Sequence, residues 1–458
     1  MQISTWRQSE KALGAAATRR SYLLIATLAF LFVANIFDPL GTLGLKYPAF
    51  LVAALSSLWA LKYFDLSSRA LTIGLTLFVV WPAWSLLYGA ARGGDMSVGL
   101  TQVTPFVFAW LLAVILPALD SRLPLRAFYA CLLLLAIVVI AAFALIIFLP
   151  ENAISQTVFG YFTSLDEKGG SFGTRSFGSV EVPWIYFTST LFLVPAFVYY
   201  LFVGRLLRAG VVLLALGLTF SKAGLTIALV FGASHSVSAL FSRSATGVAN
   251  GATAHLRKGF RRFLPAVVVG GVAVLILLSF ETFSDQITDA WAGNSGTAQV
   301  RIGHFYSVMN LFIQHPGILI VGQGAGIPFY SLGESDYVQS FEIDQLNAIR
   351  KFGLPWFIGY SAIVFYSTRK LIKAGQMEER AFGFALISAY FAAGTNPVLL
   401  SSLFVTLMTL SYFAQRRCAG VSGAQNNLVS SAGGVGSVTL QGSRRVAYGS
   451  GIETDRSA

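Results

Sequence analysis

The sequence predicts an all-α, polytopic integral membrane protein with about twelve transmembrane helices. Its 458 residues are 55% hydrophobic and only 11% charged, whereas a soluble domain carries about a quarter charged residues. The apolar residues also gather in runs of about 17 to 25, the length that crosses a bilayer. A soluble core of this size could not cover so much apolar surface, so we expect lipid to surround the chain.

Hydropathy distributes the expected spans along the whole chain. They lie near residues 21–37, 46–62, 71–89, 98–118, 126–149, 183–203, 207–220, 222–241, 263–281, 354–368, 381–395 and 397–414. The basic segment before the first span has no small-residue cleavage site, so we expect a retained helix instead of a signal peptide. The seventh and eighth spans are nearly continuous and are interrupted only at residues 220–224.

The charges predict the orientation. Most of the 32 Lys and Arg residues fall on one side of the membrane if the N-terminus is cytoplasmic, as the positive-inside rule requires. Both termini are therefore expected in the cytoplasm. The net charge of +12 is spread between the spans and forms no single patch, so no nucleic-acid partner is expected. Cys131 lies in a span and Cys418 on the cytoplasmic side, which excludes a disulfide framework.

The expected organisation has five parts. These are a cytoplasmic N-terminus (1–20), transmembrane helices one to nine (21–281) with an outer loop at 150–182, a large outer loop (282–353), transmembrane helices ten to twelve (354–417), and a disordered cytoplasmic tail (418–458). The tail is rich in Gly and Ser, a composition typical of disorder.

The large outer loop contains the segment VRIGHFYSVMNLFIQHPG. Five apolar residues recur in it at helical spacing: Val300, Phe305, Val308, Leu311 and Phe312. This spacing predicts an amphipathic helix at the membrane interface, ended by Pro316. Arg301 would lie in the first turn and His304 one turn later. A cation there opposes the helix dipole, so either it binds an anion or it reaches towards lipid headgroups.

Lys222 poses the same question between two apolar runs. It follows Ser221, an expected N-cap, and its charge is costly there unless it is paired or near water. An interfacial anchor and an anion ligand are both consistent with this position.

Two further patterns follow in the large loop. The stretch GQGAG (322–326) lacks the strand and helix of a dinucleotide-binding unit, so we expect a glycine-lined turn that lets a bulky substrate approach the backbone. Glu342 and Asp344 open a short helix ending at Gly353, where negative charge favours the helix dipole. Ordinary capping is the alternative to a functional role. No His/Cys/Asp cluster has metal-ligand spacing, so no metal is expected.

Three segments together resemble the O-antigen polymerase and O-antigen ligase superfamily. LTFSKAG resembles the family's LTxSRxG, with Lys222 at the position of Arg. VRIGHFYSVMNLFIQHPGILIVGQGAG resembles its Arg, helix, Pro and Gly-x-Gly turn, and EIDQLNAIRKFGL resembles its His-Asn-x-x-Leu-x-x-Leu-x-x-x-Gly element. Lysine keeps the charge but lacks the bidentate fork that suits phosphate. Glu342 stands at the position of the family's His, which favours the polymerases over the ligases.

The resemblance implies a GT-C-like glycosyltransferase of the bacterial cell inner membrane, with no metal or other cofactor and with its large outer loop in the periplasm. Its substrate would be an undecaprenyl diphosphate-linked oligosaccharide, from which it would polymerise O-antigen or exopolysaccharide repeat units. Glu342 would be the general base, while Lys222 and Arg301 would neutralise the leaving diphosphate with Arg175 as a third cation. His304 and Asp344 are secondary candidates. A chain-length regulator and a flippase are the implied protein partners.

Two alternatives stay open. One is an O-antigen ligase that transfers glycan to the lipid A core. The other is a lipid-linked oligosaccharide flippase or transporter, a class that also has about twelve helices. Transporters need ionisable groups near the bilayer midplane, and the expected spans here contain almost no charge.

Overall fold

The computed structural model describes most of residues 21–244 and 296–416. The short gaps are residues 40, 42, 65, 120–121, 150–151, 165–171, 178–179, 220, 375 and 395. The expected span at 263–281, the N-terminal segment 1–20 and the tail 418–458 lie outside the described residues. Three described helices are long and apolar enough to cross a membrane: Ser68–Ala91, Met96–Ala118 and Arg122–Phe148. With the shorter apolar helices, they indicate a bilayer environment.

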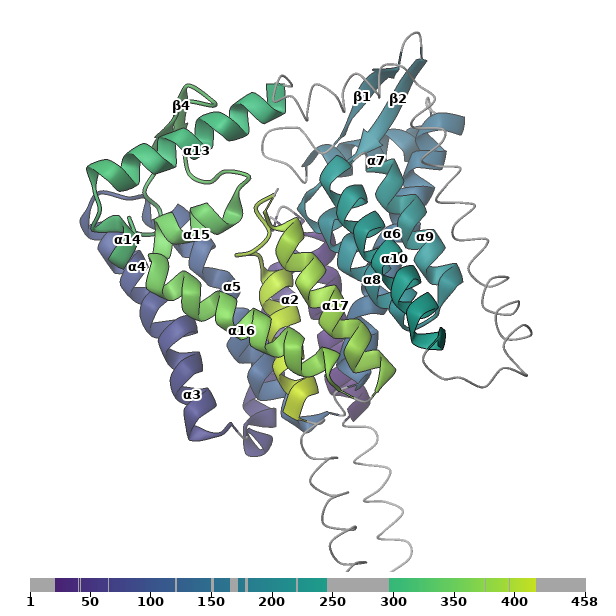
Figure 1. Cartoon of the computed structure of the whole chain (residues 1–458), viewed down its shortest axis with the longest axis horizontal. Coiled ribbons are helices and arrows are strands. Elements are labelled where there is room, and N and C mark those ends of the chain that lie inside the picture. Colours follow the sequence, from purple (N-terminus) through teal and green to yellow (C-terminus); the bar gives the residue numbers. More distant parts are fainter. Residues whose placement is uncertain are drawn as a thin grey trace, which may run out of the picture. The chain divides into compact units, whose positions relative to one another are not determined.

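The described helices follow the expected apolar runs (Figure 1). The first group comprises helix Ser21–Phe37, α2 (Lys46–Ala60), η1 (Leu61–Tyr63), α3 (Ser68–Leu75), η2 (Thr76–Val80), α4 (Trp81–Ala91), α5 (Met96–Ile115), η3 (Leu116–Ala118), α6 (Arg122–Phe148) and α7 (Ala153–Ser164). Next come η4 (Thr188–Phe192), α8 (Leu193–Phe202), α9 (Leu206–Leu218) and α10 (Lys222–Ser244). The last group comprises α13 (Gly296–Gln314), α14 (Ile318–Val321), α15 (Asp344–Phe352), α16 (Leu354–Ile372), α17 (Met377–Ala392) and a helix at 402–416.

Two antiparallel hairpins correct the all-α prediction. Strand β1 (Phe172–Phe177) pairs with β2 (Val180–Ile185), and β3 (Phe329–Ser331) pairs with β4 (Asp336–Val338). In the second hairpin Phe329 lies opposite Val338, and both side chains are buried. The protein is therefore mostly helical, with small strand pairs in the segments expected to form the two long outer loops.

Local capping sets several helix starts. Asp95 precedes α5, and its Oδ1 accepts hydrogen bonds from the backbone N–H groups of Ser97 (2.8 Å) and Val98 (3.2 Å). Ser221 precedes α10, and its Oγ accepts from the Gly224 N–H (3.2 Å). This contact confirms the predicted N-cap at the break between α9 and α10, since it supplies one of the backbone N–H groups that a helix start leaves unpaired.

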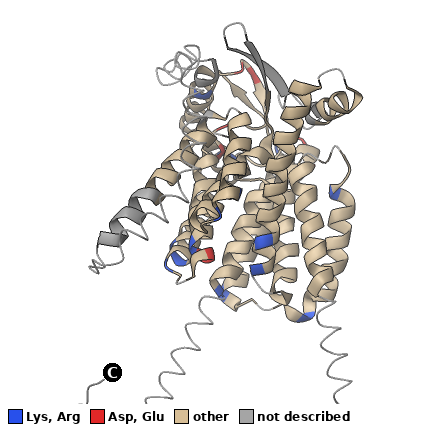
Figure 2. Cartoon of the chain, turned by 90° about the vertical axis from the view of Figure 1, so that its right-hand side faces the viewer, with Lys and Arg blue, Asp and Glu red and all other residues tan. Residues whose placement is uncertain are grey.

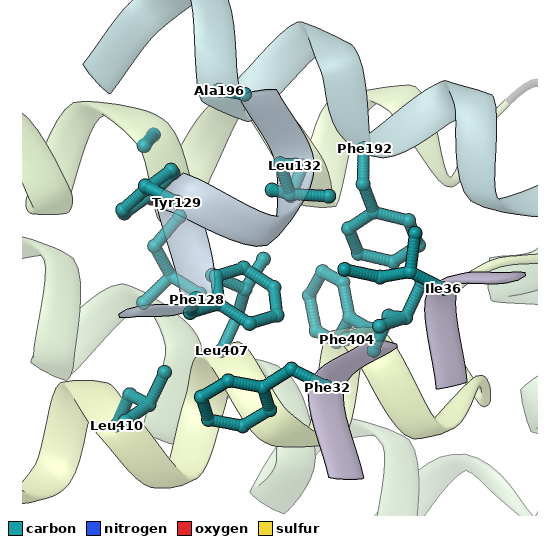
Figure 3. Close-up of a cluster of buried hydrophobic side chains, with 14 of the residues drawn as sticks. Phe32, Ile36, Phe128, Tyr129, Leu132, Phe192, Ala196, Phe404, Leu407 and Leu410 are labelled. Carbon is teal, nitrogen blue, oxygen red and sulfur yellow. The ribbon is translucent and has the colours of Figure 1, made fainter. Parts of the chain in front are cut away.

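The core lies where helices distant in sequence meet. Figure 3 shows the side chains pointing towards one another from helix Ser21–Phe37, α6, the η4–α8 segment and helix 402–416. The labelled ones are Phe32, Ile36, Phe128, Tyr129, Leu132, Phe192, Ala196, Phe404, Leu407 and Leu410. Phe32 and Phe128 meet edge to face at 5.3 Å between ring centroids, a preferred aromatic geometry.

The two ends of the helix bundle differ in charge. We call the end that carries residues 296–353 the loop end; α4 finishes and α5 starts there. At the other end lie the basic residues Lys62, Arg69, Arg122, Arg126, Arg205, Arg208, Arg369, Lys370, Lys373 and Arg380. The described acidic residues there, Glu378 and Glu379, contact Arg126 and Arg122. Figure 2 shows most of the blue basic positions in its lower half.

Candidate functional site

The helix that carries Arg301 and His304 starts earlier than predicted. Helix α13 covers Gly296–Gln314 and stops before Pro316, as expected. Arg301 therefore lies in its second turn, and the argument from a cation in the first turn no longer applies. Val308 and Phe312 are buried, whereas Phe305 is exposed. The apolar residues that we grouped on one face thus lie on two.

The β3–β4 hairpin is fixed on α13 by a close backbone approach. Gly303 and Gly333 face each other, and a side chain on Gly303 would overlap the Gly333 backbone. The Leu332 N–H donates to Ser307 Oγ (2.8 Å), which in turn donates to the Gly303 carbonyl (2.8 Å). Only glycine permits this approach. The hairpin consequently brings the chain after β4, including Glu342, back to the first half of α13.

Arg301 and Glu342 form an ion pair at this point. Arg301 Nε donates to Glu342 Oε2, although the residues are 41 positions apart. The side chains are 36% and 38% exposed, so a ligand from solvent or from a membrane surface can reach both. Within the described part of the chain, Glu342 Oε1 has no hydrogen-bond partner. The pair thus offers a carboxylate oxygen that accepts a proton and a guanidinium that binds phosphate.

His304 lies in the contact between α13 and the hairpin. It is buried, with Nδ1 2.6 Å from Ser331 Oγ and Nε2 3.5 Å from Glu334 Oε1. Ser331 Oγ accepts from the N–H groups of Gly333 (3.1 Å) and Glu334 (3.3 Å), so its proton is directed to His304 Nδ1 and the ring proton to Glu334. His304 therefore supports the hairpin, and the buried Ser331 is not accessible as a nucleophile.

Asp344 joins α15 to the last helix. It is fully buried, and its Oδ2 accepts from the N–H groups of Leu399 (2.5 Å) and Leu400 (3.3 Å). These contacts hold residues 398–400 outside a helix, which explains why the helix starts at 402 and not near 397 as predicted. Burial raises the pKa of Asp344 to about 6, while Lys351 and the hydrogen bonds oppose the rise. Asp344 is a structural residue that substrate does not reach.

Arg350 is the central residue that the sequence did not reveal. Its side chain has 0% exposure, and its NH1 donates to Gln323 Oε1 (2.7 Å) and the Ile327 carbonyl (2.9 Å). NH2 donates to the Gln339 carbonyl (2.8 Å) and Asn347 Oδ1 (3.0 Å). A buried cation must be bonded on most sides to be tolerated. Arg350 therefore fixes the glycine turn, the hairpin and α15 in one arrangement.

The glycine turn does not make room for a substrate, contrary to our prediction. Gly322, Gly324 and Gly326 all have positive φ, but chain segments of the protein itself fill the space beside them. A Cβ on Gly324 would lie 2.6 Å from Gly89 Cα, and one on Gly326 would overlap the Asp95 carbonyl oxygen. The turn is glycine-rich because it packs directly on the α4–α5 connection.

One side of α4 holds this segment at the loop end. Trp81 Nε1 donates to the Phe352 carbonyl (2.6 Å), Ser85 Oγ donates to the Lys351 carbonyl (2.9 Å), and the Ser85 carbonyl accepts from the Ala325 N–H (3.0 Å). Gly89 packs against Ala325 one turn later. Residues at four-residue spacing lie on one helix face, so a single stripe of a candidate membrane span holds the glycine turn and the end of α15.

The other two predicted phosphate ligands are described only by their backbone. Lys222 is the first residue of α10, and Arg175 lies in β1 opposite Val182; both side chains lie outside the described residues.

Among the described residues, no group of three or more His, Cys, Asp or Glu side chains could hold a metal ion. In comparisons with known proteins, no family model and no curated protein matches the chain.

Proposed function

We propose that this protein is a glycosyltransferase that polymerises glycan repeat units carried on undecaprenyl diphosphate. The observation that supports this most is the Arg301–Glu342 pair, partly exposed and held at one end of a bundle of apolar helices. A carboxylate beside a guanidinium meets the two needs of glycosyl transfer from a lipid diphosphate, a proton acceptor and a counter-charge for the leaving group.

In the proposed reaction, Glu342 Oε1 accepts the proton of the acceptor sugar hydroxyl. The hydroxyl oxygen bonds to the anomeric carbon of the donor while the bond from that carbon to the diphosphate oxygen breaks. The diphosphate leaves with its lipid and its added negative charge, which Arg301 neutralises. A guanidinium is planar and carries five N–H donors, which suits it to bind diphosphate oxygens. Lys222 and Arg175 are proposed as further cations for the same diphosphate.

The charge difference between the bundle ends supports the proposed orientation. Basic residues at cytoplasmic connections orient membrane proteins, and most of those of the described chain lie opposite the loop end. We therefore place the loop end in the periplasm, the termini in the cytoplasm and the protein in the bacterial inner membrane. A flippase must supply lipid-linked units to that face, and a chain-length regulator is the second proposed partner.

The test is to give the purified protein one lipid-linked repeat unit and to separate the products by size. Glu342→Gln should slow chain growth about 10²- to 10⁴-fold, the usual contribution of a general base. Arg301→Gln should also slow it, and Arg301→Lys should restore part of the rate. Asp336→Asn is the matched control, because Asp336 is an exposed acid of the β3–β4 hairpin that precedes Glu342 and should leave the rate unchanged.

Three results would contradict the proposal in different ways. Normal-length polymer from Glu342→Gln would remove Glu342 from its proposed role. Transfer only to the lipid A core would assign the ligase activity instead of polymerisation. No turnover of a substrate that a known polymerase accepts would exclude both enzymes and leave the transporter alternative.

A further inference from the structure

The exposed side of α13 carries four apolar residues beside the polar Gln299, Asn310 and Gln314. Ile302, Phe305, Tyr306 and Ile313 are exposed, and Ile313 reaches 79%. Phe305 and Tyr306 follow Ile302 by three and four residues, and Ile313 follows Tyr306 by seven, which places all four on one helix face. At a rise of 1.5 Å per residue, this stripe is about 17 Å long. We call these four residues the α13 stripe. Residues 302–314 contain no Asp, Glu, Lys or Arg.

The opposite side of α13 is already occupied. Val308 and Phe312 are buried in a cluster with Ile318 of α14, Phe329 of β3 and Val338 of β4. The stripe is therefore additional to the surface that folding requires. A solvated helix normally carries charge on its outer face, so a stripe with two aromatic and two aliphatic side chains and no charge is not the expected water-facing surface.

The contacts of the segment after α13 place the end of this helix relative to a candidate membrane span. The span Ser68–Ala91 ends two residues after Gly89, which packs on Ala325, so the glycine turn lies at the depth of the last turn of that span. Helix α14, which immediately precedes the turn, exposes Ile320 at 64%. Figure 1 shows α13 crossing the loop end at a steep angle to α3 and α4. The C-terminal end of α13 is thus held close to the membrane boundary.

We infer that the α13 stripe rests on the lipid bilayer, with α13 lying along the membrane surface at the loop end. Apolar side chains on a surface helix enter the boundary between headgroups and acyl chains, and aromatic residues are favoured at that depth. Ile313 near the end of α13 and Ile320 in α14 are both exposed apolar side chains. The face of α13 that the sequence predicted for the interface, with Val308 and Phe312, is not the one that meets lipid.

This placement has a consequence for the substrate, which rests on the proposed function. Arg301 lies one turn before Phe305, at the edge of the stripe, so its guanidinium lies in the headgroup layer. The diphosphate of a lipid-linked sugar occupies the same layer. The Arg301–Glu342 pair would then meet the diphosphate at its natural depth, without lifting the lipid out of the membrane.

Site-directed spin labelling tests the inference without requiring turnover. In the full chain, Cys131 and Cys418 are replaced by Ala, and single cysteines are introduced by Phe305→Cys and Ile313→Cys. Tyr337→Cys is the control, because Tyr337 is also an exposed aromatic residue of this segment but lies on the hairpin. The labelled proteins are placed in vesicles of phosphatidylethanolamine and phosphatidylglycerol. Collision rates with oxygen, which concentrates in lipid, are compared with those of a water-soluble nickel chelate.

Labels at 305 and 313 should collide more with oxygen than with the nickel chelate, and the label at 337 should show the reverse. A preference for nickel at 305 and 313 would place the stripe in water and overturn the inference. Low collision rates with both reagents would mean that protein, such as a second copy of the chain, covers the stripe, and would overturn it equally. Each result is independent of Glu342→Gln kinetics, so failure here and failure of the proposed function can be told apart.

Discussion

Gly326→Ala should destabilise the protein more than Gly93→Ala, although both glycines have nearly the same φ angle. Their φ angles are +78° and +80°, and a Cβ on Gly93 meets nothing within 4 Å. Alanine at positive φ lowers the free energy of unfolding by about 1–2 kcal/mol through strain. Alanine also lowers the entropy of the unfolded chain, which offsets roughly 0.4–1 kcal/mol of this loss. Gly93→Ala should therefore cost about 1 kcal/mol of unfolding free energy.

Gly326→Ala carries the same strain and an additional overlap with the Asp95 carbonyl oxygen. That carbonyl belongs to the start of a span and already accepts the Gly99 N–H (2.8 Å), so it cannot move freely. Overpacking typically adds about 1–3 kcal/mol, which brings the expected loss to about 2–4 kcal/mol. The measurement is reversible unfolding of both variants by SDS in mixed micelles, at equal protein concentration. Equal free energies for the two variants would refute the packing role of the glycine turn.

Two further changes test residues near the site. Between pH 3.8 and about 6, folded Asp344 holds a proton that the unfolded chain has released; its contribution to stability is therefore lost as pH rises through this window. Asp344→Asn should make the free energy of unfolding depend less on pH in this window, as measured by unfolding at several pH values. An unchanged pH dependence would assign it to another group. Ser221→Ala should cost about 1 kcal/mol of unfolding free energy through loss of the N-cap of α10; Ser221→Asn should keep most of it, and equal losses from both would argue against capping.

Hydropathy predicted most helix positions well because a bilayer imposes one strong requirement, a long apolar run. The expected spans at 46–62 and 98–118 correspond to Lys46–Ala60 and Met96–Ala118. The predicted helix ending at Pro316 and the one ending at Gly353 are also confirmed. The latter ends as expected because Gly353 adopts φ of +85°, the conformation of a glycine C-cap. Whether all twelve runs cross the membrane stays a prediction.

The site was harder to predict because its contacts join distant segments. Arg301 and Glu342 were both chosen as candidates, yet nothing in their spacing shows that they touch. Sequence reasoning missed Arg350 because the acceptors of its NH1 and NH2 groups are four neutral oxygens between residues 323 and 347, and no charge pattern marks such acceptors. The small strands β3 and β4 are three residues each, too short for an alternating pattern to be recognised.

The span Ser68–Ala91 contains a five-residue π turn, Thr76–Val80, just before Trp81. The buried Trp356 Nε1 of α16 donates to the Leu77 carbonyl within this turn (2.8 Å). A π turn holds one residue more than an α-helical path, and each residue turns a helix by about 100°. This single residue decides which way the side chains of α4 point around the helix axis. If it were deleted and the preceding turns stayed in place, Trp81, Ser85 and Gly89 would rotate away from their partners. The contacts that hold the glycine turn and the end of α15 thus depend on the residue count of the helix before them.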